Sequence, residues 1–287
     1  MPLPSCQATG NRCFFAFLSL LLLVLGGCVE QSIVFKVLHD GTALIHVRTF
    51  TMPPPFGAAK AADDLPKGVN ETLVAELLKE LGPGVTVKSN ENSSNSRGWA
   101  GTELILLCDD VNSLKLTPEA IELLMATGNR DYTKKGEIKD ESSDAKNGLN
   151  KLDIEFELNE DQLVVNLNWQ YAKQEPITKD RAQDPFANRP AASNPWATSF
   201  LASVLREIRT GVYVETERKI TKSNASYAVR NDTLITIMEL DGSKIDTDKF
   251  NKLSGKPPTS QADAKAMLKD FEGLSVETQP KVIVDLE

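Results

Sequence analysis

Residues that commonly carry out chemistry are scarce in this chain, which has two His and four Cys among its 287 residues. His39 and His46 both fall in a predicted β-hairpin over residues 33–50. Its turn contains Asp40-Gly41, a pair that supplies the positive φ of a tight turn. In this hairpin the two imidazoles point to opposite faces, since successive strand residues alternate between faces. We therefore expect the two His residues to form neither a metal site nor a catalytic pair.

Carboxylates provide two further candidate sites. Asp109 and Asp110 could form an acid/base pair, but adjacent strand residues point to opposite faces, which favours a strand-end turn or helix cap. The acidic run 241–248 lacks acids at the third and fifth positions of a calcium loop, so we expect no metal there. Motifs for dinucleotide or phosphate binding, zinc proteases and serine hydrolases do not occur in the sequence. We predict no catalytic residue and no cofactor, and expect that the protein is not an enzyme.

Cys28 is the most informative reactive residue, because it follows Leu25-Gly26-Gly27 and an apolar run over residues 13–25. A membrane-spanning helix needs about 20 apolar residues, so this shorter run has the length of a signal-peptide core. Leu, two small residues and Cys resemble the lipobox of bacterial lipoproteins, whose Cys thiol takes a diacylglycerol. We expect cleavage between Gly27 and Cys28 and lipidation of Cys28, with acyl chains such as palmitate. The alternative is an uncleaved signal anchor with a chance Cys.

Removal of residues 1–27 as a lipoprotein signal peptide would take Cys6 and Cys13 away from the mature chain. With Cys28 acylated, Cys108 is the one remaining thiol, and no internal disulfide is expected. Cys108 ends an apolar strand segment, which predicts a small buried side chain rather than a nucleophile.

The overall composition excludes several classes of protein. Hydrophobic residues make up 41% and charged residues 25% of the chain, which is typical of globular proteins and not of disordered or collagen-like ones. The formal net charge is −8, whereas a general nucleic-acid binder needs a surplus of positive charge, so we expect no nucleic-acid partner. The three Trp residues lie in apolar patterns and are expected in the core: Trp99, Trp169 and Trp196.

Residues 28–127 are predicted to form a first α+β half. We expect the first hairpin to pair Phe35 with Val47 and Val37 with Ile45, which puts four apolar side chains on one face. Helical spacing of apolar residues predicts a helix over 69–81 that ends at Gly82. The remaining predicted elements are a strand at 85–87, a polar turn at 90–97, a strand at 99–108, and a short helix capped by Thr117 that runs to Met125.

Residues 128–150 are rich in charge and poor in apolar residues, which predicts an exposed charged linker. Residues 151–287 follow as a second α+β half. Clean alternation predicts a hairpin of strands 152–158 and 163–169. The other predicted elements are a helix from Asn194 to Gly211, strands near 212–221, 227–230, 233–240 and 274–286, and short helices near 246–253 and 260–271.

The order of elements is similar in the two halves, and residues 77–87 resemble residues 204–214. Internal duplication of a ββαββα unit would explain this, and so would the chance likeness of any helix that ends in Gly before a strand. Strands and helices do not alternate regularly, as a parallel sheet would require. The predicted fold class is therefore α+β, with a mainly antiparallel sheet and packed amphipathic helices.

Beyond the lipobox, residues 36–42 resemble the first hairpin of a class of bacterial envelope lipoproteins with an Asp-Gly-Ser-Gly-like turn, although Thr42-Ala43 replaces Ser-Gly here. Three further segments are similar to that class: 97–101, 109–114 and 220–225. A more distant resemblance is to the mycobacterial LppM-type lipoprotein domain. The likeness covers most of the chain after residue 27. It implies a lipid-anchored envelope protein and brings no catalytic residues.

Three functions from different classes remain open. The first is a bacterial envelope lipoprotein with a non-catalytic binding or structural role, held on the extracytoplasmic side of a membrane through the lipid on Cys28. The second is a carrier of a lipid or another hydrophobic ligand, which a large apolar cavity would favour. The third is a carboxylate-dependent hydrolase, which buried carboxylates converging in a cleft would favour.

Overall fold

The computed structural model describes residues 29–52, 68–128, 151–170, 203, 205–227, 233–246, 260–269 and 271–287. Within these residues the chain forms twelve strands and three α-helices, arranged around two mainly antiparallel sheets. This confirms the predicted α+β class. The predicted signal peptide, nearly all of the charged linker and most of the helix predicted from Asn194 lie outside the described residues.

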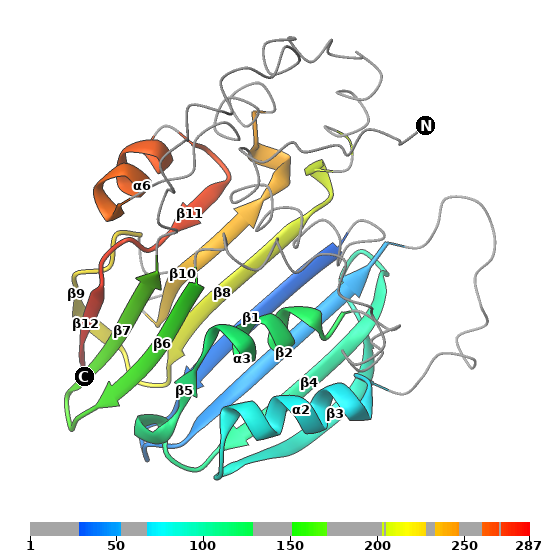
Figure 1. The fold of residues 1–287 in the computed structure, drawn as a ribbon, viewed down its shortest axis with the longest axis horizontal. Helices are drawn as coiled ribbons and strands as arrows, with labels where there is room; N and C mark the ends of the chain where they lie inside the picture. The colour runs from blue at the N-terminus through cyan, green and yellow to red at the C-terminus, as the bar shows by residue number, and fades with distance from the viewer. Residues whose placement is uncertain are drawn as a thin grey trace, which may run out of the picture.

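The larger sheet has seven strands in the order β11-β10-β8-β1-β2-β4-β3. All its neighbouring strands are antiparallel except β1 and β8, which run parallel. Strands from both sides of the predicted linker therefore share this sheet (Figure 1). The bounds of its strands are β1 (Val29–Val37), β2 (Ala43–Thr51), β3 (Val85–Ser94), β4 (Ala100–Cys108), β8 (Arg209–Thr216), β10 (Leu234–Asp241) and β11 (Leu274–Val276).

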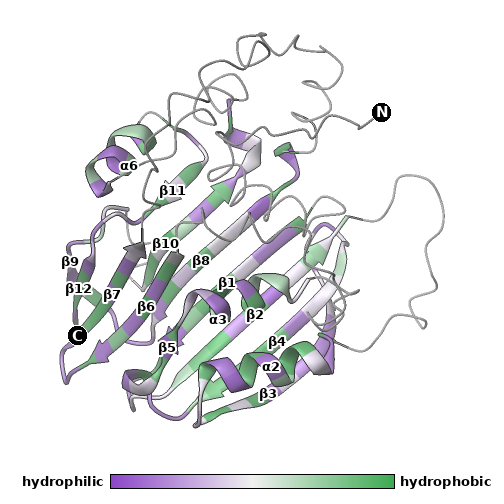
Figure 2. Ribbon diagram, in the orientation of Figure 1, coloured by the Kyte–Doolittle hydropathy of each residue, from purple (hydrophilic) through white to green (hydrophobic). Residues whose placement is uncertain are grey.

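The smaller sheet has five strands in the order β5-β6-β7-β12-β9. Its central hairpin of β6 and β7 confirms the second predicted hairpin, and hydrophobic and hydrophilic residues alternate along it (Figure 2). Alternation with a period of two puts one set of side chains on the core face. The bounds of the strands are β5 (Lys115–Leu116), β6 (Lys151–Leu158), β7 (Gln162–Gln170), β9 (Ile220–Ser223) and β12 (Lys281–Leu286).

The three α-helices are α2 (Glu71–Leu81), α3 (Pro118–Ala126) and α6 (Gln261–Leu268). Asn70 caps α2 by accepting a hydrogen bond from the backbone N–H of Thr72 at 2.8 Å. Thr117 caps α3 with Pro118 as its first residue, as predicted. A capping side chain satisfies an N–H group that has no partner within the helix, which explains where both helices begin. Two 3-10 turns complete the described elements: η2 (Val111–Ser113) and η5 (Gly242–Lys244).

The five-stranded sheet, α2 and α3 lie side by side over the same face of the seven-stranded sheet (Figure 1). One hydrophobic core fills the space between these layers and takes residues from both sheets and both helices. Phe35 of β1 and Phe156 of β6 meet across it. The strands of the larger sheet end at two opposite ends of the molecule, one where β1 begins and one where β1 ends.

The predicted register of the first hairpin is wrong by two residues. Phe35 pairs with Ile45 and Val37 with Ala43. The backbone N–H of Leu38 donates to the carbonyl oxygen of Thr42 at 2.9 Å, so residues 39–41 form the loop. Because the shift is an even number of residues, the predicted apolar side chains still share the core face.

Three other predicted boundaries are also wrong. β3 continues through the predicted polar turn as far as Ser94, because its backbone pairs with β4 along the edge of the sheet. Gly211 does not end a helix but lies inside β8, which already begins at Arg209. The predicted last strand is two strands, β11 and β12, which belong to different sheets.

The internal duplication is not confirmed by the arrangement of the strands. The β1–β2 hairpin belongs to the seven-stranded sheet, whereas the β6–β7 hairpin belongs to the five-stranded one. The segments that resemble each other in sequence also differ in place, since β3 is an edge strand and β8 lies between β1 and β10. The division of the chain at residues 128–150 stays a prediction.

Candidate functional site

Cys28 and the predicted cleavage site between Gly27 and Cys28 lie outside the described residues. The described fold begins at the next residue, because Val29 is already the first residue of β1. Its side chain is buried, and it pairs with Thr51 of β2. A lipid on Cys28 would therefore be attached directly to the central strand of the larger sheet. Among the described residues, no helix has the length and hydropathy needed to cross a membrane.

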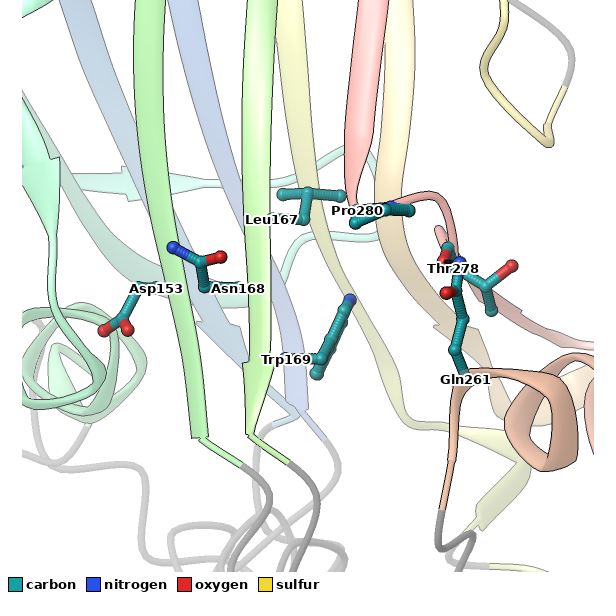
Figure 3. Close-up of a pocket in the computed structure, with 7 residues that line it drawn as sticks. All are labelled: Asp153, Leu167, Asn168, Trp169, Gln261, Thr278 and Pro280. Atoms are coloured by element: carbon teal, nitrogen blue, oxygen red, sulfur yellow. Dashed lines mark hydrogen bonds between the residues drawn. The ribbon is translucent and has the colours of Figure 1, made fainter.

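A pocket of about 420 Å³ opens beside β7, next to the start of α6. Leu167 and Trp169 lie on the side of β7 that faces Thr278 and Pro280 (Figure 3). The indole Nε1 of Trp169 donates to the carbonyl oxygen of Glu277 at 3.1 Å, which fixes the ring. Asp153 and Asn168 also line the pocket, and their side chains lie on the opposite side of β7 (Figure 3). Trp169 packs against the core as predicted, but it also provides an aromatic wall to this pocket.

Glu277, which directly precedes the pocket-lining Thr278, is a fully buried residue. Its carboxylate accepts hydrogen bonds from the N–H of Ser226 at 2.6 Å, the hydroxyl of Ser226 at 2.7 Å and the N–H of Gln279 at 2.7 Å. A buried charge is costly unless such donors satisfy it. Glu277 therefore holds the connection between β11 and β12 against the loop at Ser226, which also positions the pocket wall.

A second, more polar pocket of about 390 Å³ lies where β1 and β8 begin and β10 ends. Asp241 at its edge forms ion pairs with Lys244 at 3.1 Å and Arg209 at 3.6 Å. Burial raises the pKa of Asp241, but hydrogen bonds from Ser243 and Lys244 and the charge of Arg209 outweigh it, so the pKa lies below its ordinary value. Asp241 also caps η5. These contacts give the start of the acidic run 241–248 a structural role.

The two His residues contact different carboxylates. His39 lies exposed in the first turn, and its Nδ1 is 2.7 Å from a carboxylate oxygen of Glu217. This hydrogen bond raises the pKa of His39 above its ordinary value. His46 hydrogen-bonds Glu103 of β4, which also accepts from Arg48 at 2.9 Å. Each imidazole is thus committed to its own glutamate rather than to the other His.

Cys108 is buried, as predicted, and its thiol donates to the carbonyl oxygen of Asp110 at 3.3 Å. Burial raises the pKa of this thiol, which disfavours the reactive thiolate. Asp110 caps η2 by accepting from the N–H of Asn112, which confirms the predicted helix cap at the end of the strand. Neither residue is therefore arranged for acid/base or nucleophilic chemistry.

Sequence reasoning missed the pocket and its buried Glu277. The residue follows a short strand in an otherwise polar stretch, where nothing in the spacing of neighbouring residues indicates burial. The pocket itself combines β6 and β7 with residues more than 90 positions later in the chain, so no local pattern could predict it.

Comparison with known proteins found no matching family model and no matching curated protein. Among solved structures, the chain is similar to the folded domain of LppM from Mycobacterium tuberculosis, with a TM-score of 0.34 and 12% sequence identity. The match covers 91% of each chain.

Proposed function

We propose that the protein is a bacterial envelope lipoprotein, anchored on the extracytoplasmic side of a membrane by a lipid on Cys28, with a non-catalytic binding or structural role. The observation that carries this proposal is the position of Cys28, which ends a lipobox-like sequence and directly precedes the first residue of β1. A cleaved lipoprotein needs its folded part to begin after the lipidated Cys. In the described residues β1 starts at Val29, and its described pairing with β2 and β8 uses none of residues 1–27.

The non-catalytic role is supported by the contacts of three buried or half-buried carboxylates. Glu277 accepts three hydrogen bonds, Asp241 pairs with two cations, and Glu103 is shared between His46 and Arg48. Such contacts hold the fold together: both carboxylate oxygens of Glu277 and of Asp241, and Oε1 of Glu103, contact these partners. The carboxylate-hydrolase alternative gains no support from them.

The test compares two variants by detergent partitioning. Cys28→Ala should block lipidation and leave unprocessed precursor held by its apolar segment. Replacing residues 1–28 with a cleavable signal of a non-lipidated exported protein should give a soluble protein outside the cytoplasm. If this second protein still partitions with membranes, the main attachment lies elsewhere and the proposal fails.

Carriage of a hydrophobic ligand is the second candidate, and the pocket at Trp169 is the observation that favours it. Its volume lies within the range of ligand pockets, about 300–1,000 Å³, and Leu167, Trp169 and Pro280 give it an apolar side. Native mass spectrometry of protein extracted gently from its own membrane tests this function. A carrier should retain a small ligand that Trp169→Ala releases, whereas the Val87→Ala control on the exposed edge of β3 should retain it.

A further inference from the structure

β7 extends past the end of its partner β12, which leaves an open strand edge beside the pocket at Trp169. β12 pairs with β7 as far as Asn166, and the N–H of Leu167 adds a last hydrogen bond to the carbonyl oxygen of Pro280 at 2.8 Å. Along an antiparallel strand, every second residue turns its N–H and C=O toward the same neighbour. Trp169 therefore turns both groups to this side, where β12 provides no partner for them.

The apolar side of the pocket is made by Leu167, Trp169 and Pro280 (Figure 3). The indole N–H is already used on the carbonyl oxygen of Glu277 at 3.1 Å, so the ring offers the pocket an apolar surface and no donor. The volume of about 420 Å³ lies in the lower part of the range of ligand pockets, about 300–1,000 Å³. This size favours a single short chain over a lipid with two long chains.

The polar groups on this side of the pocket include both a donor and acceptors. The backbone of Trp169 provides one N–H and one C=O. Gln261, the first residue of α6, donates from Nε2 to the carbonyl oxygen of Thr278, and its Oε1 is a further acceptor. A hydroxyl or a primary amide can donate and accept, whereas a carboxylate can only accept. These groups therefore match a neutral hydrogen-bonding head better than a carboxylate.

The charge at the pocket disfavours an anionic head. Asp153 is the one charged residue among the described residues that line the pocket, and they include no Lys, Arg or His. It pairs with Asn168 on the opposite side of β7 from Trp169 (Figure 3). An anion that enters a pocket without a cation loses hydration and gains no ion pair, and a nearby carboxylate repels it.

We propose that the pocket at Trp169 binds a neutral, single-chain amphiphile with a hydroxyl or amide head and selects against an anionic amphiphile of the same chain length. The proposal rests on the second candidate function, carriage of a hydrophobic ligand, and names the chemical class of that ligand. The apolar chain lies against Leu167, Trp169 and Pro280. The head reaches the open backbone groups of Trp169 and the side-chain amide of Gln261.

Two photoreactive probes that differ only in their heads test this selectivity. They are decanol and decanoate with the same diazirine on the chain, used at about pH 8, where a carboxylic acid is ionised. The full chain is purified from its membranes, kept soluble in an amphipathic polymer and illuminated with each probe at equal free concentration. Digestion and mass spectrometry then measure the label on each peptide.

Decanol should label the peptides that contain Trp169 and Thr278 about tenfold more strongly than decanoate does, a ratio that corresponds to roughly 1.4 kcal/mol of binding free energy. Trp169→Ala should lose most of the decanol label. Asp153→Asn should raise the decanoate label, because it removes the repelling charge while Trp169 stays in place. Unchanged decanoate labelling in Asp153→Asn would contradict the role given to this charge.

Two results separate the selectivity from the function on which it rests. Labelling of the pocket peptides by decanoate that equals or exceeds labelling by decanol would overturn the selectivity and leave carriage of a hydrophobic ligand intact. If decanol labels these peptides no more than the peptide that contains the exposed Val87, the pocket holds no such ligand, and the carrier function fails together with the selectivity.

Discussion

Phe35 of β1 and Phe156 of β6 pack with ring centroids 5.8 Å apart and planes tilted by 47°. Each ring comes from a different sheet, and both side chains are at most 2% exposed. Tilted aromatic pairs at this separation are favourable beyond the area that they bury. This contact joins the two sheets across the core that they share.

Phe156→Ala should therefore destabilise the protein by about 3–5 kcal/mol, because it removes a buried ring and leaves a cavity between the sheets. The free energy of unfolding in urea measures the effect. Val87→Ala is the matched control, since Val87 is 42% exposed and its truncation should cost no more than about 0.5 kcal/mol. A loss below about 1 kcal/mol in Phe156→Ala would show that the sheets do not depend on this contact.

Gln31 should also stabilise the fold by joining β1 to α3. Its buried Nε2 donates to the carbonyl oxygens of Leu124 and Met125 at the end of α3. Gln31→Ala should cost about 1–3 kcal/mol by leaving these carbonyls without that donor. Gln31→Glu should cost more at neutral pH, because an ionised carboxylate only accepts hydrogen bonds and would face two carbonyl oxygens.

The donor role of Gln31 also predicts how the destabilisation by Gln31→Glu changes with pH. A protonated Glu can donate again, so the difference in unfolding free energy between Gln31→Glu and the parent should shrink as pH falls through the carboxyl pKa of the variant. Urea unfolding at several pH values measures it. A penalty that stays constant or grows on acidification would contradict the donor role of Gln31.

The sequence predicted which residues face the core more reliably than which residues pair. In the first hairpin the alternation identified the core face, but the pairing differs by two residues because the side chain of Asp40 accepts from the N–H and hydroxyl of Thr42. Gly41, the last residue of this loop, then takes a positive φ of 85°. A period of two fixes the face of a strand and leaves an even shift undecided.

Long-range pairing accounts for the other misses. β8 pairs in parallel with β1 across about two thirds of the chain, so Gly211 sits in a strand despite its resemblance to a helix stop. The side chain of Tyr213 lies over Gly211 and occupies the space that a Cβ would need. The polar residues of β3 likewise form a strand because β4 provides their backbone partners. These contacts depend on residues that no local window contains.

His39 and Glu217 should form a pH-dependent contact at the turn of the first hairpin. The pKa of His39 is raised, so its contribution to stability is present below the ordinary His pKa and is lost as pH rises through the raised value. The pKa of Glu217 is lowered by its hydrogen bond from His39, so its contribution is lost as pH falls through that lowered value. The contact is therefore strongest between the ordinary pKa values of Glu and His.

A titration of the His39 ring followed by NMR measures this contact directly. Glu217→Gln should lower the pKa of His39 toward its ordinary value, because it removes the negative charge that favours the imidazolium. The resonance of His46, which contacts Glu103 instead, provides the internal control. An unchanged His39 titration in Glu217→Gln would contradict the assigned contact.

Cys108 should react with a disulfide reagent only when the protein opens. Its thiol is 1% exposed and burial raises its pKa, so the native rate should be more than about 100-fold below that of the exposed Ser96→Cys thiol. Guanidinium should bring Cys108 to the rate of a free thiol. Rapid labelling of Cys108 in the folded protein would mean that the core around the end of β4 opens under native conditions.

The mass of the N-terminal peptide from protein extracted out of its own membranes tests the proposed function most directly. The account predicts a peptide that begins at Cys28 and carries a diacylglyceryl group, and it predicts that Cys28→Ala accumulates precursor that still contains residues 1–27. A mature chain that begins at residue 28 without lipid, or normal cleavage of Cys28→Ala, would contradict it.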